Sequence, residues 1–160
     1  MTGFKTENDV SPEAIAVAEL PAAVIANRIA DMHTGDAVEL VNELDDDDAV
    51  AVVAQLSHDD AVRLLDQPEL HHATEIVVAL PQARAASLLD GMSADRATDV
   101  FQELDADDRA RLFPILAPET KVALKKLMGY PPNTAGSLMT TEFIAVPSNW
   151  TVAETLAHIR

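Results

Sequence analysis

Large apolar residues recur at every twelfth position along most of the chain. These positions are Leu20, Met32, Leu44, Leu56, Leu80, Met92, Leu104, Leu116 and Met128, with Pro68 as the single exception. Alanine stands five residues later in six consecutive units, at Ala37, Ala49, Ala61, Ala73, Ala85 and Ala97. An aliphatic pair such as Leu64-Leu65 or Leu88-Leu89 follows eight or nine residues after the anchor. These spacings place the apolar side chains of each unit on one helical face.

Helix start signals follow directly after the anchors, so each unit is predicted to be one short helix and a turn. Asp45, Ser57, Ser93 and Asp105 are capping residues, and Pro21, Pro68, Pro81 and Pro118 suit a first helical position. A helix of about nine residues is roughly 13 Å long, and it is marginal when isolated in water. We therefore predict an all-α fold in which about nine to ten consecutive helices pack on one another and wind into a superhelix. The sequence leaves its hand open.

The repeat has recognisable ends. Pro114 is incompatible with a helix interior, so the helix that begins near Asp105 is predicted to end near Phe113. After Met128 the chain becomes rich in proline and glycine, which is typical of a linker. The predicted divisions are an N-terminal tail and first helix over 1–19, the superhelical domain over 20–128, a linker over 129–137, and a different unit over 138–160.

That last unit has the signals of a strand followed by a helix. Phe143–Val146 is prone to form a strand and is ended by Pro147, and Thr151–Glu154 has the spacing of a capping box. The helix would carry Val152, Leu156 and Ile159, with Trp150 in the core of the same unit. Because one strand and one helix cannot bury their own faces, we expect a longer natural chain and no stable independent structure beyond about 137.

Composition and charge narrow the possible functions. The 160 residues are 48% hydrophobic and carry 11 Lys and Arg against 27 Asp and Glu, a formal net charge of -16. Such a chain is repelled by nucleic acid and by anionic membrane surfaces. It has no cysteine, which fits a cytosolic location, and neither a signal peptide nor an apolar span that would insert this fragment directly into a membrane. No nucleophile or phosphate-binding pattern is present, so we expect no enzyme activity.

The repeat and the junction that follows it together resemble a known family. The junction contains Gly129-Tyr130-Pro131, the run Thr134-Ala135-Gly136-Ser137-Leu138-Met139-Thr140-Thr141, and the strand and helix signals up to Leu156. Beyond residue 20 the chain closely resembles the cytosolic part of MgtE-family magnesium channels. The helical half also resembles parts of the flagellar motor switch protein FliG, whereas the junction is more specific because it leads into the opening of a CBS domain.

The resemblance implies a regulatory role within a larger assembly. The superhelical domain would lie on paired CBS domains, on the cytoplasmic side of a bacterial inner (plasma) membrane, below a pore formed by a homodimer. Mg2+ held between these domains would keep the pore closed, and loss of Mg2+ would release the superhelical domain and open it. The alternative function is a FliG-like scaffold for protein-protein interaction without metal sensing.

The resemblance also indicates candidate metal ligands. Asp95 and Asp99 match acids of the family that face the CBS domains, and Ser137 matches a junction residue whose backbone carbonyl contributes. Ser87 stands where the family has an acid, which puts one ligand in doubt. The structural alternative is that acids in a first helical turn favour the helix dipole and pair with a basic neighbour such as Arg96. Because the opposing CBS acids are absent, we expect only weak Mg2+ binding by this fragment.

Other charged groups are explained more simply by folding. Asp45-Asp46-Asp47-Asp48 lies at a predicted helix start, where carboxylates cap the helix, although ten acids without Lys or Arg between residues 31 and 60 also attract cations diffusely. His71 and His72, with Glu75 one turn later, have helical spacing for a transition metal, but no further ligand with a recognisable spacing follows. Solvated side chains are therefore the favoured interpretation. Five basic residues between 109 and 126 serve either as helix C-terminal charges or as a docking face.

Overall fold

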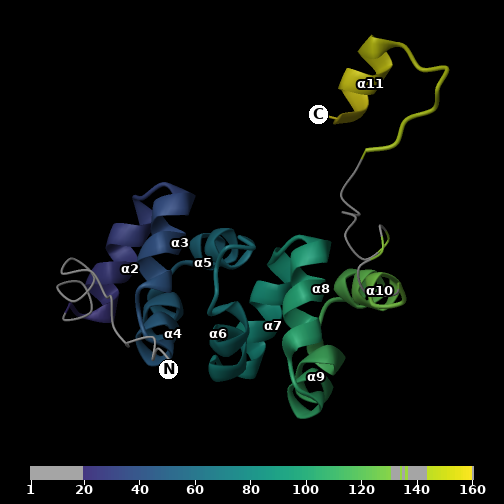
Figure 1. The fold of residues 1–160 in the computed structure, drawn as a ribbon. Helices are drawn as coiled ribbons and strands as arrows, with labels where there is room; N and C mark the ends of the chain where they lie inside the picture. The colour runs from purple at the N-terminus through teal and green to yellow at the C-terminus, as the bar shows by residue number, and fades with distance from the viewer. Residues whose placement is uncertain (1–19, 131–133, 135, 137–143, 160) are drawn as a thin grey trace, which may run out of the picture.

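A computed structural model describes residues 20–130, 134, 136 and 144–159, and within these ranges every regular element is a helix. The elements are α2 (Ala22–Ala30), α3 (Thr34–Asn42), α4 (Asp46–Gln55), α5 (His58–Leu65), α6 (Ala73–Ala79), α7 (Gln82–Gly91), α8 (Ala94–Glu103), α9 (Ala106–Leu112), the 3-10 turn η1 (Phe113–Ile115), α10 (Pro118–Leu127) and α11 (Val152–Ile159). Figure 1 shows α2 to α10 as one array of short helices, with α11 apart from it. The predicted all-α superhelical fold is confirmed.

The closest packing joins each helix to the helix two places along, and this differs from the sequence-based expectation. α2 packs on α4, α4 on α6, α6 on α8 and α8 on α10, while α3, α5, α7 and α9 form a second such series. Short turns predict that sequential helices pack against each other at steep angles, but the larger contacts join alternate helices instead. The reason lies in the turns, where two successive extended residues such as Leu56 and Ser57 send the next helix off at a steep angle.

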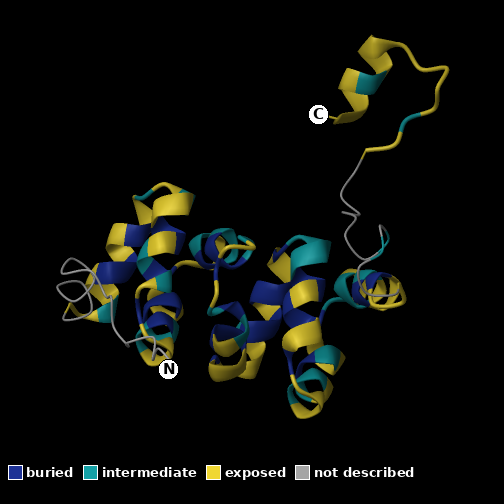
Figure 2. Ribbon diagram, in the orientation of Figure 1, coloured by how far each residue is buried: buried dark blue, intermediate teal, exposed yellow. Residues whose placement is uncertain are grey.

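The core is formed by the positions that the repeat singles out. The alanines five residues after the anchors are at most 2% exposed, and so are the pairs Leu64-Leu65, Ile76-Val77 and Leu88-Leu89. Small side chains at these positions let two helices approach closely. The anchors sit in the turns, where Leu44 through Leu116 are buried and the terminal anchors Leu20 and Met128 are exposed. Figure 2 shows the resulting buried stripe on each helix, facing its neighbours in the array.

The helix boundaries follow the predicted signals with identifiable exceptions. Asp45, Ser57 and Asp105 each accept a hydrogen bond from the backbone N–H three residues on, as expected of capping residues. α9 gives way to the 3-10 turn at Phe113, as Pro114 requires.

Three of the four prolines do not occupy the predicted first helical position. Pro118 does so in α10, whereas Pro21 and Pro81 stand one residue earlier as N-caps and Pro68 lies in the seven-residue turn between α5 and α6. In that turn Leu70 is 2% exposed and takes the place of the missing anchor.

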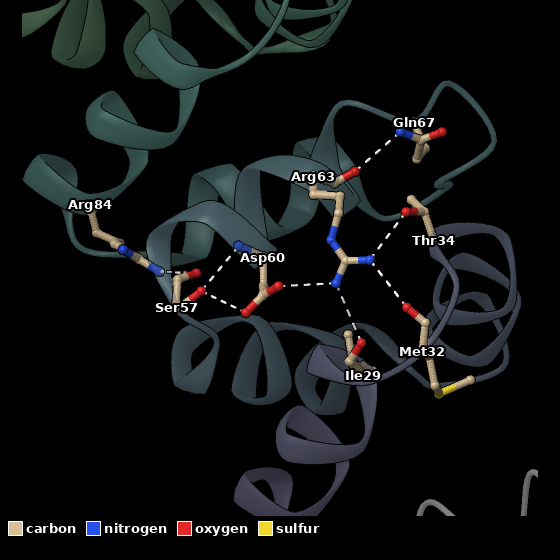
Figure 3. Close-up of polar contacts among 8 residues, drawn as sticks. All are labelled: Ile29, Met32, Thr34, Ser57, Asp60, Arg63, Gln67 and Arg84. Carbon is tan, nitrogen blue, oxygen red and sulfur yellow. Dashed lines mark hydrogen bonds and ion pairs between the residues drawn. The ribbon is translucent and has the colours of Figure 1, made fainter.

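An arginine side chain forms hydrogen bonds at the corner where one helix ends and the next begins, and Figure 3 shows this for Arg63 of α5 at the turn between α2 and α3. Arg63 of α5 donates from Nη1 to the carbonyl of Met32 at 3.2 Å and to Thr34 Oγ1 at 3.1 Å, and from Nη2 to the carbonyl of Ile29 at 3.5 Å. The same guanidinium lies 3.0 Å from Asp60 Oδ1. The last carbonyls of a helix have no partner within the helix itself, so Arg63 supplies one to the end of α2.

The same geometry recurs along the array, always from one helix to the end of the helix three before it. Arg84 of α7 donates to the carbonyls of Leu56 and Ser57 after α4, and Arg111 of α9 donates to the carbonyl of Val78 in α6. In the opposite sense, side chains near a helix end accept backbone N–H groups from the turn three helices on. Asn42 accepts from His71, Asp66 from Ser93 and Asp90 from Ala117. Apolar packing in the array therefore joins helices two places apart, whereas side-chain hydrogen bonds join helices three places apart.

The segment after the array is described in part. The predicted strand over Phe143–Val146 is not described at Phe143, and residues 144–147 have no regular secondary structure. The capping box at Thr151 and Glu154 is confirmed, since the Thr151 backbone N–H donates to Glu154 Oε2 at 2.7 Å and the Glu154 N–H donates to Thr151 Oγ1 at 3.3 Å. No residue of α11 is buried. Residues 1–19 and most of 131–143, on which parts of the predicted tail, linker and CBS opening fall, lie outside the described residues.

Two helical glycines give a matched test of helix packing. A Cβ on Gly91 would lie 2.7 Å from Val62 Cγ2, whereas a Cβ on Gly35 meets nothing within 4 Å. We predict that Gly91→Ala destabilises the chain by about 1–3 kcal/mol through overpacking of α7 on α5. Gly35→Ala should stabilise it by about 0.5–1 kcal/mol because alanine is the better helix former. Urea unfolding of both variants checks the prediction, and equal effects would contradict it.

Asp60 generates a prediction about pH. Hydrogen bonding from the Ser57 hydroxyl, together with Arg63, holds the pKa of Asp60 below its ordinary value. A carboxyl with a lowered folded pKa contributes stability above its unfolded pKa and loses it as the pH falls through the folded value. Asp60→Asn should therefore lower the free energy of unfolding at pH 7, with a difference from wild type that shrinks toward pH 3.

The neighbouring substitution Asp59→Asn is the control, because the Asp59 side chain is exposed. It should leave this pH dependence unchanged. A constant difference between wild type and Asp60→Asn across the pH range would show that the charge of Asp60 contributes nothing.

Candidate metal site

The two candidate ligands of the superhelical domain lie on α8, which is fixed from both sides. Its inner face buries Ala97, Val100 and Phe101. Its first turn is attached to α5, because the Ser93 backbone N–H and hydroxyl both donate to Asp66 Oδ1, at 2.8 and 2.7 Å. The predicted N-cap Ser93 thus uses its hydroxyl between helices and makes no capping bond within α8.

Arg96 fixes the same turn. Its Nε donates to the carbonyl of Leu65 at 3.1 Å and its Nη2 donates to the carbonyl of Leu70 at 3.2 Å. The sequence-based alternative placed Arg96 in a surface ion pair with the acids beside it. The ion pairs found among the described residues are instead Arg63–Asp60 and Arg111–Asp108, and His72 contacts Asp46 through a ring nitrogen. Arg96 therefore joins α8 to the end of α5 and the turn after it, and it forms no direct ion pair with Asp95 among the described residues.

Asp95 carries an unsatisfied carboxylate oxygen. The residue is half-buried, and its Oδ1 is inaccessible to solvent and has no hydrogen-bond partner in the described parts of the chain. Leaving a buried polar atom without a partner costs about 1–3 kcal/mol, and more for a charged group. Because this oxygen is out of reach of solvent, an ion brought by another surface would meet the remaining, accessible part of the half-buried side chain.

Asp99 follows one turn later on the same helix and has an unfavourable electrostatic environment for its charge. Partial removal from water raises the pKa of Asp99 above its ordinary value. The nearby positive charge of Arg96 lowers the pKa, while Asp95 and Glu103 add to the rise. Three acids along one helix face thus repel one another, and a divalent cation would relieve that repulsion.

The other residues of the predicted site are placed differently. Ser137 lies outside the described residues. Ser87, which stands where the family resemblance calls for an acid, is exposed on α7, with its Oγ 3.5 Å from His58 Nδ1. No cluster of three or more His, Asp or Glu side chains able to hold a metal ion occurs among the residues that the structure describes. Asp95 and Asp99 therefore offer an incomplete ligand set.

A hollow of about 170 Å³ lies beside the first turn of α8. Met92, Ala94 and Ala97 line one side, and residues of α10, including Ala123 and Leu124, line the other. The lining is largely apolar. The surface next to Asp95 thus combines an acid with an apolar recess.

The remaining charged candidates have structural roles. In the aspartate run, Asp45 caps α4 and Asp46 Oδ1 lies 2.8 Å from His72 Nδ1. The capping interpretation is confirmed, but the expectation of a solvated His72 is wrong, because its side chain is 17% exposed. Asp46 and His72 are 26 residues apart, close to two repeats, and this spacing was the sequence signal for their contact.

Basic residues near the end of the array are also used within the chain. Lys121 Nζ donates to the carbonyl of Pro114 at 2.8 Å, and Lys125 Nζ lies 5.4 Å from the centroid of the Phe113 ring. These contacts explain part of the basic character of α10 without a partner domain. None of the helices in the described ranges combines the length and apolar character needed to cross a bilayer.

The packing and the corner bonds define a superhelical repeat domain, and α8 carries acids on one of its faces. A family model described as the MgtE intracellular N domain matches residues 32–133. The chain belongs to this family.

Solved structures agree with the family match. The crystal structure of the cytosolic domain of the Mg2+ channel MgtE in complex with ATP is similar with a TM-score of 0.74 and 26% identity, over 94% of this chain and 61% of that chain. That of the soluble part of a magnesium transporter is similar in fold with a TM-score of 0.73 and 24% identity, over 91% of this chain and 59% of that chain. This chain thus spans about three fifths of their length. A comparison with curated proteins finds no significant match.

The raised pKa of Asp99 generates a prediction. A carboxyl whose folded pKa is raised destabilises the folded state when it is ionised, and this penalty disappears as the pH falls and the group is protonated. Asp99→Asn should therefore raise the thermal midpoint at pH 7 and have a smaller effect near pH 4. Asp107→Asn, which removes the same charge from the exposed first turn of α9, should leave the midpoint unchanged or lower. Equal effects of the two variants would contradict the prediction.

Proposed function

We propose that this chain is the Mg2+-sensing regulatory domain of a magnesium channel or transporter, with no enzyme activity of its own. The observation that carries the proposal is the pair of carboxylates of Asp95 and Asp99, one turn apart on the firmly held α8, where the charge of Asp95 disfavours ionisation of Asp99. Membership of the MgtE intracellular N domain family supports it. So do the neighbours described as parts of a magnesium transporter and a Mg2+ channel.

The chemistry of Mg2+ fits this surface. Mg2+ keeps several of its waters and is bound through one or two carboxylates, so it does not need a complete protein cage. Asp95 and Asp99 would supply carboxylates from α8, Ser137 would supply its backbone carbonyl, and acids of a CBS domain would face them across bound water. Without the cation, two acidic surfaces repel each other and separate.

Docking in this form couples the Mg2+ concentration to the pore. At high Mg2+ the superhelical domain would be held against the CBS domains of a homodimer and the pore would stay closed. At low Mg2+ it would be released and the pore would open. The domain would then lie on the cytoplasmic side of the plasma membrane, with the transport step in parts of the assembly beyond this chain.

Protease protection tests the proposal in a longer chain that continues through both CBS motifs. Millimolar Mg2+ should slow cleavage between residues 128 and 137, and NaCl of the same ionic strength should not. Asp95→Asn combined with Asp99→Asn should abolish the Mg2+ effect, while Asp107→Asn should retain it. Cleavage that is indifferent to Mg2+ in the wild-type chain would favour the FliG-like scaffold without metal sensing.

The 160-residue chain alone gives a second readout. Calorimetry should find only weak Mg2+ binding, because the opposing acids are supplied by another domain. A tight stoichiometric site within this chain would contradict the shared-site arrangement.

A further inference from the structure

A second hollow lies in the N-terminal half of the array. It measures about 250 Å³ and is formed between α3 and the turn that joins α5 to α6, with Gly35, Val38 and Glu39 on one side and Gln67, Glu69 and His71 on the other. Pockets for drug-sized ligands are about 300–1,000 Å³. This hollow is therefore suited to a single side chain rather than to a nucleotide or similar cofactor.

The walls of the hollow are held in place by Asn42 at the end of α3. Its Nδ2 donates to the carbonyl of Glu69 at 2.8 Å, and its Oδ1 accepts the backbone N–H of His71 at 3.0 Å. The turn from 66 to 72 is the one long interruption of the repeat between α2 and α10. Because Asn42 ties this turn to α3, the hollow exists before any partner arrives, which lowers the entropic cost of binding.

The floor of the hollow is apolar and its rim is acidic. Val38 is 4% exposed, and a Cβ added at Gly35 would meet no atom within 4 Å, so the space above the helix backbone is open. The side chains of Glu39 and Glu69 are exposed and form no hydrogen bond or ion pair with other described residues. Two arginines that contact this part of the array are already bonded: Arg63 to Asp60 and backbone carbonyls, and Arg96 to the carbonyls of Leu65 and Leu70.

We propose that this hollow receives an arginine side chain from a basic segment of a partner protein. The guanidinium plane is apolar on its faces and donates in its plane, so it can lie over Val38 and Gly35 while it bonds the carboxylates at the rim. Ten acids and no Lys or Arg between residues 31 and 60 raise the local concentration of such a segment. Neither Asp95 nor Asp99 lines this hollow, and its use does not depend on Mg2+.

The test is titration of the 160-residue chain with a capped tetrapeptide that carries two arginines between glycines, followed by backbone chemical shifts at physiological salt. The largest shifts should fall on α3 and residues 66–72. Gly35→Phe fills the hollow without changing the charge of the chain, and it should weaken binding at least about tenfold. Glu39→Gln combined with Glu69→Gln should weaken it by a similar factor while leaving the hollow open.

Ala54→Phe is the matched control, since it adds the same ring at an exposed position of α4. It should bind the peptide as the wild-type chain does. Thermal melting of each variant establishes that it is folded. Equal affinities for Gly35→Phe and Ala54→Phe, or shifts spread over the whole acidic surface, would overturn the proposal, because the attraction would then be general electrostatics.

Discussion

The fold depends on how very short helices satisfy the polar groups at their ends. Each helix of the array has seven to ten residues, so a large share of its backbone lies in terminal turns whose carbonyl and N–H groups lack partners within the helix. Carbonyls at the end of a helix accept hydrogen bonds from an arginine three helices later, namely Arg63, Arg84, Arg96 or Arg111. Backbone N–H groups at the start of a helix donate to a side chain three helices earlier, namely Asn42, Asp66 or Asp90. These bonds close each corner while apolar packing joins alternate helices, and both are needed because a single helix of this length is marginal in water.

The same corner bonds explain why the candidate site is incomplete. Asp66 and Arg96 hold the first turn of α8 against α5, which fixes Asp95 on a rigid element with one carboxylate oxygen buried and unpaired. Arg96 in that turn donates to backbone carbonyls and forms no ion pair with these acids among the described residues, although its charge still lowers the pKa of Asp99. One arginine against Asp95, Asp99 and Glu103 leaves a net negative charge on this face of α8. This is the physical basis for the proposed Mg2+-dependent docking onto another acidic surface.

Much of the array follows from the sequence because its signals are local. The alanine and leucine positions, the caps at Asp45, Ser57 and Asp105, and the end of α9 before Pro114 each depend on residues within one helix and its turn. The spacing of helix starts predicts a first helical position at Pro68, whereas the structure has a seven-residue turn there in which Leu70 is buried in place of the anchor. Sequence and family resemblance together indicated Asp95 and Asp99, but neither could indicate which of their oxygens lacked a partner.

The series of short amphipathic helices and the acidic surplus follow from the amino-acid sequence, because a twelve-residue apolar period and helix caps act within one or two turns. The packing of alternate helices, the bonds from arginines to helix ends, and the hollow between α3 and the turn from 66 to 72 emerge only in three dimensions. Those features join residues about two to three repeats apart, where many pairings satisfy the same pattern. The choice among them depends on the angles set by extended residues in the turns, which no single helix specifies.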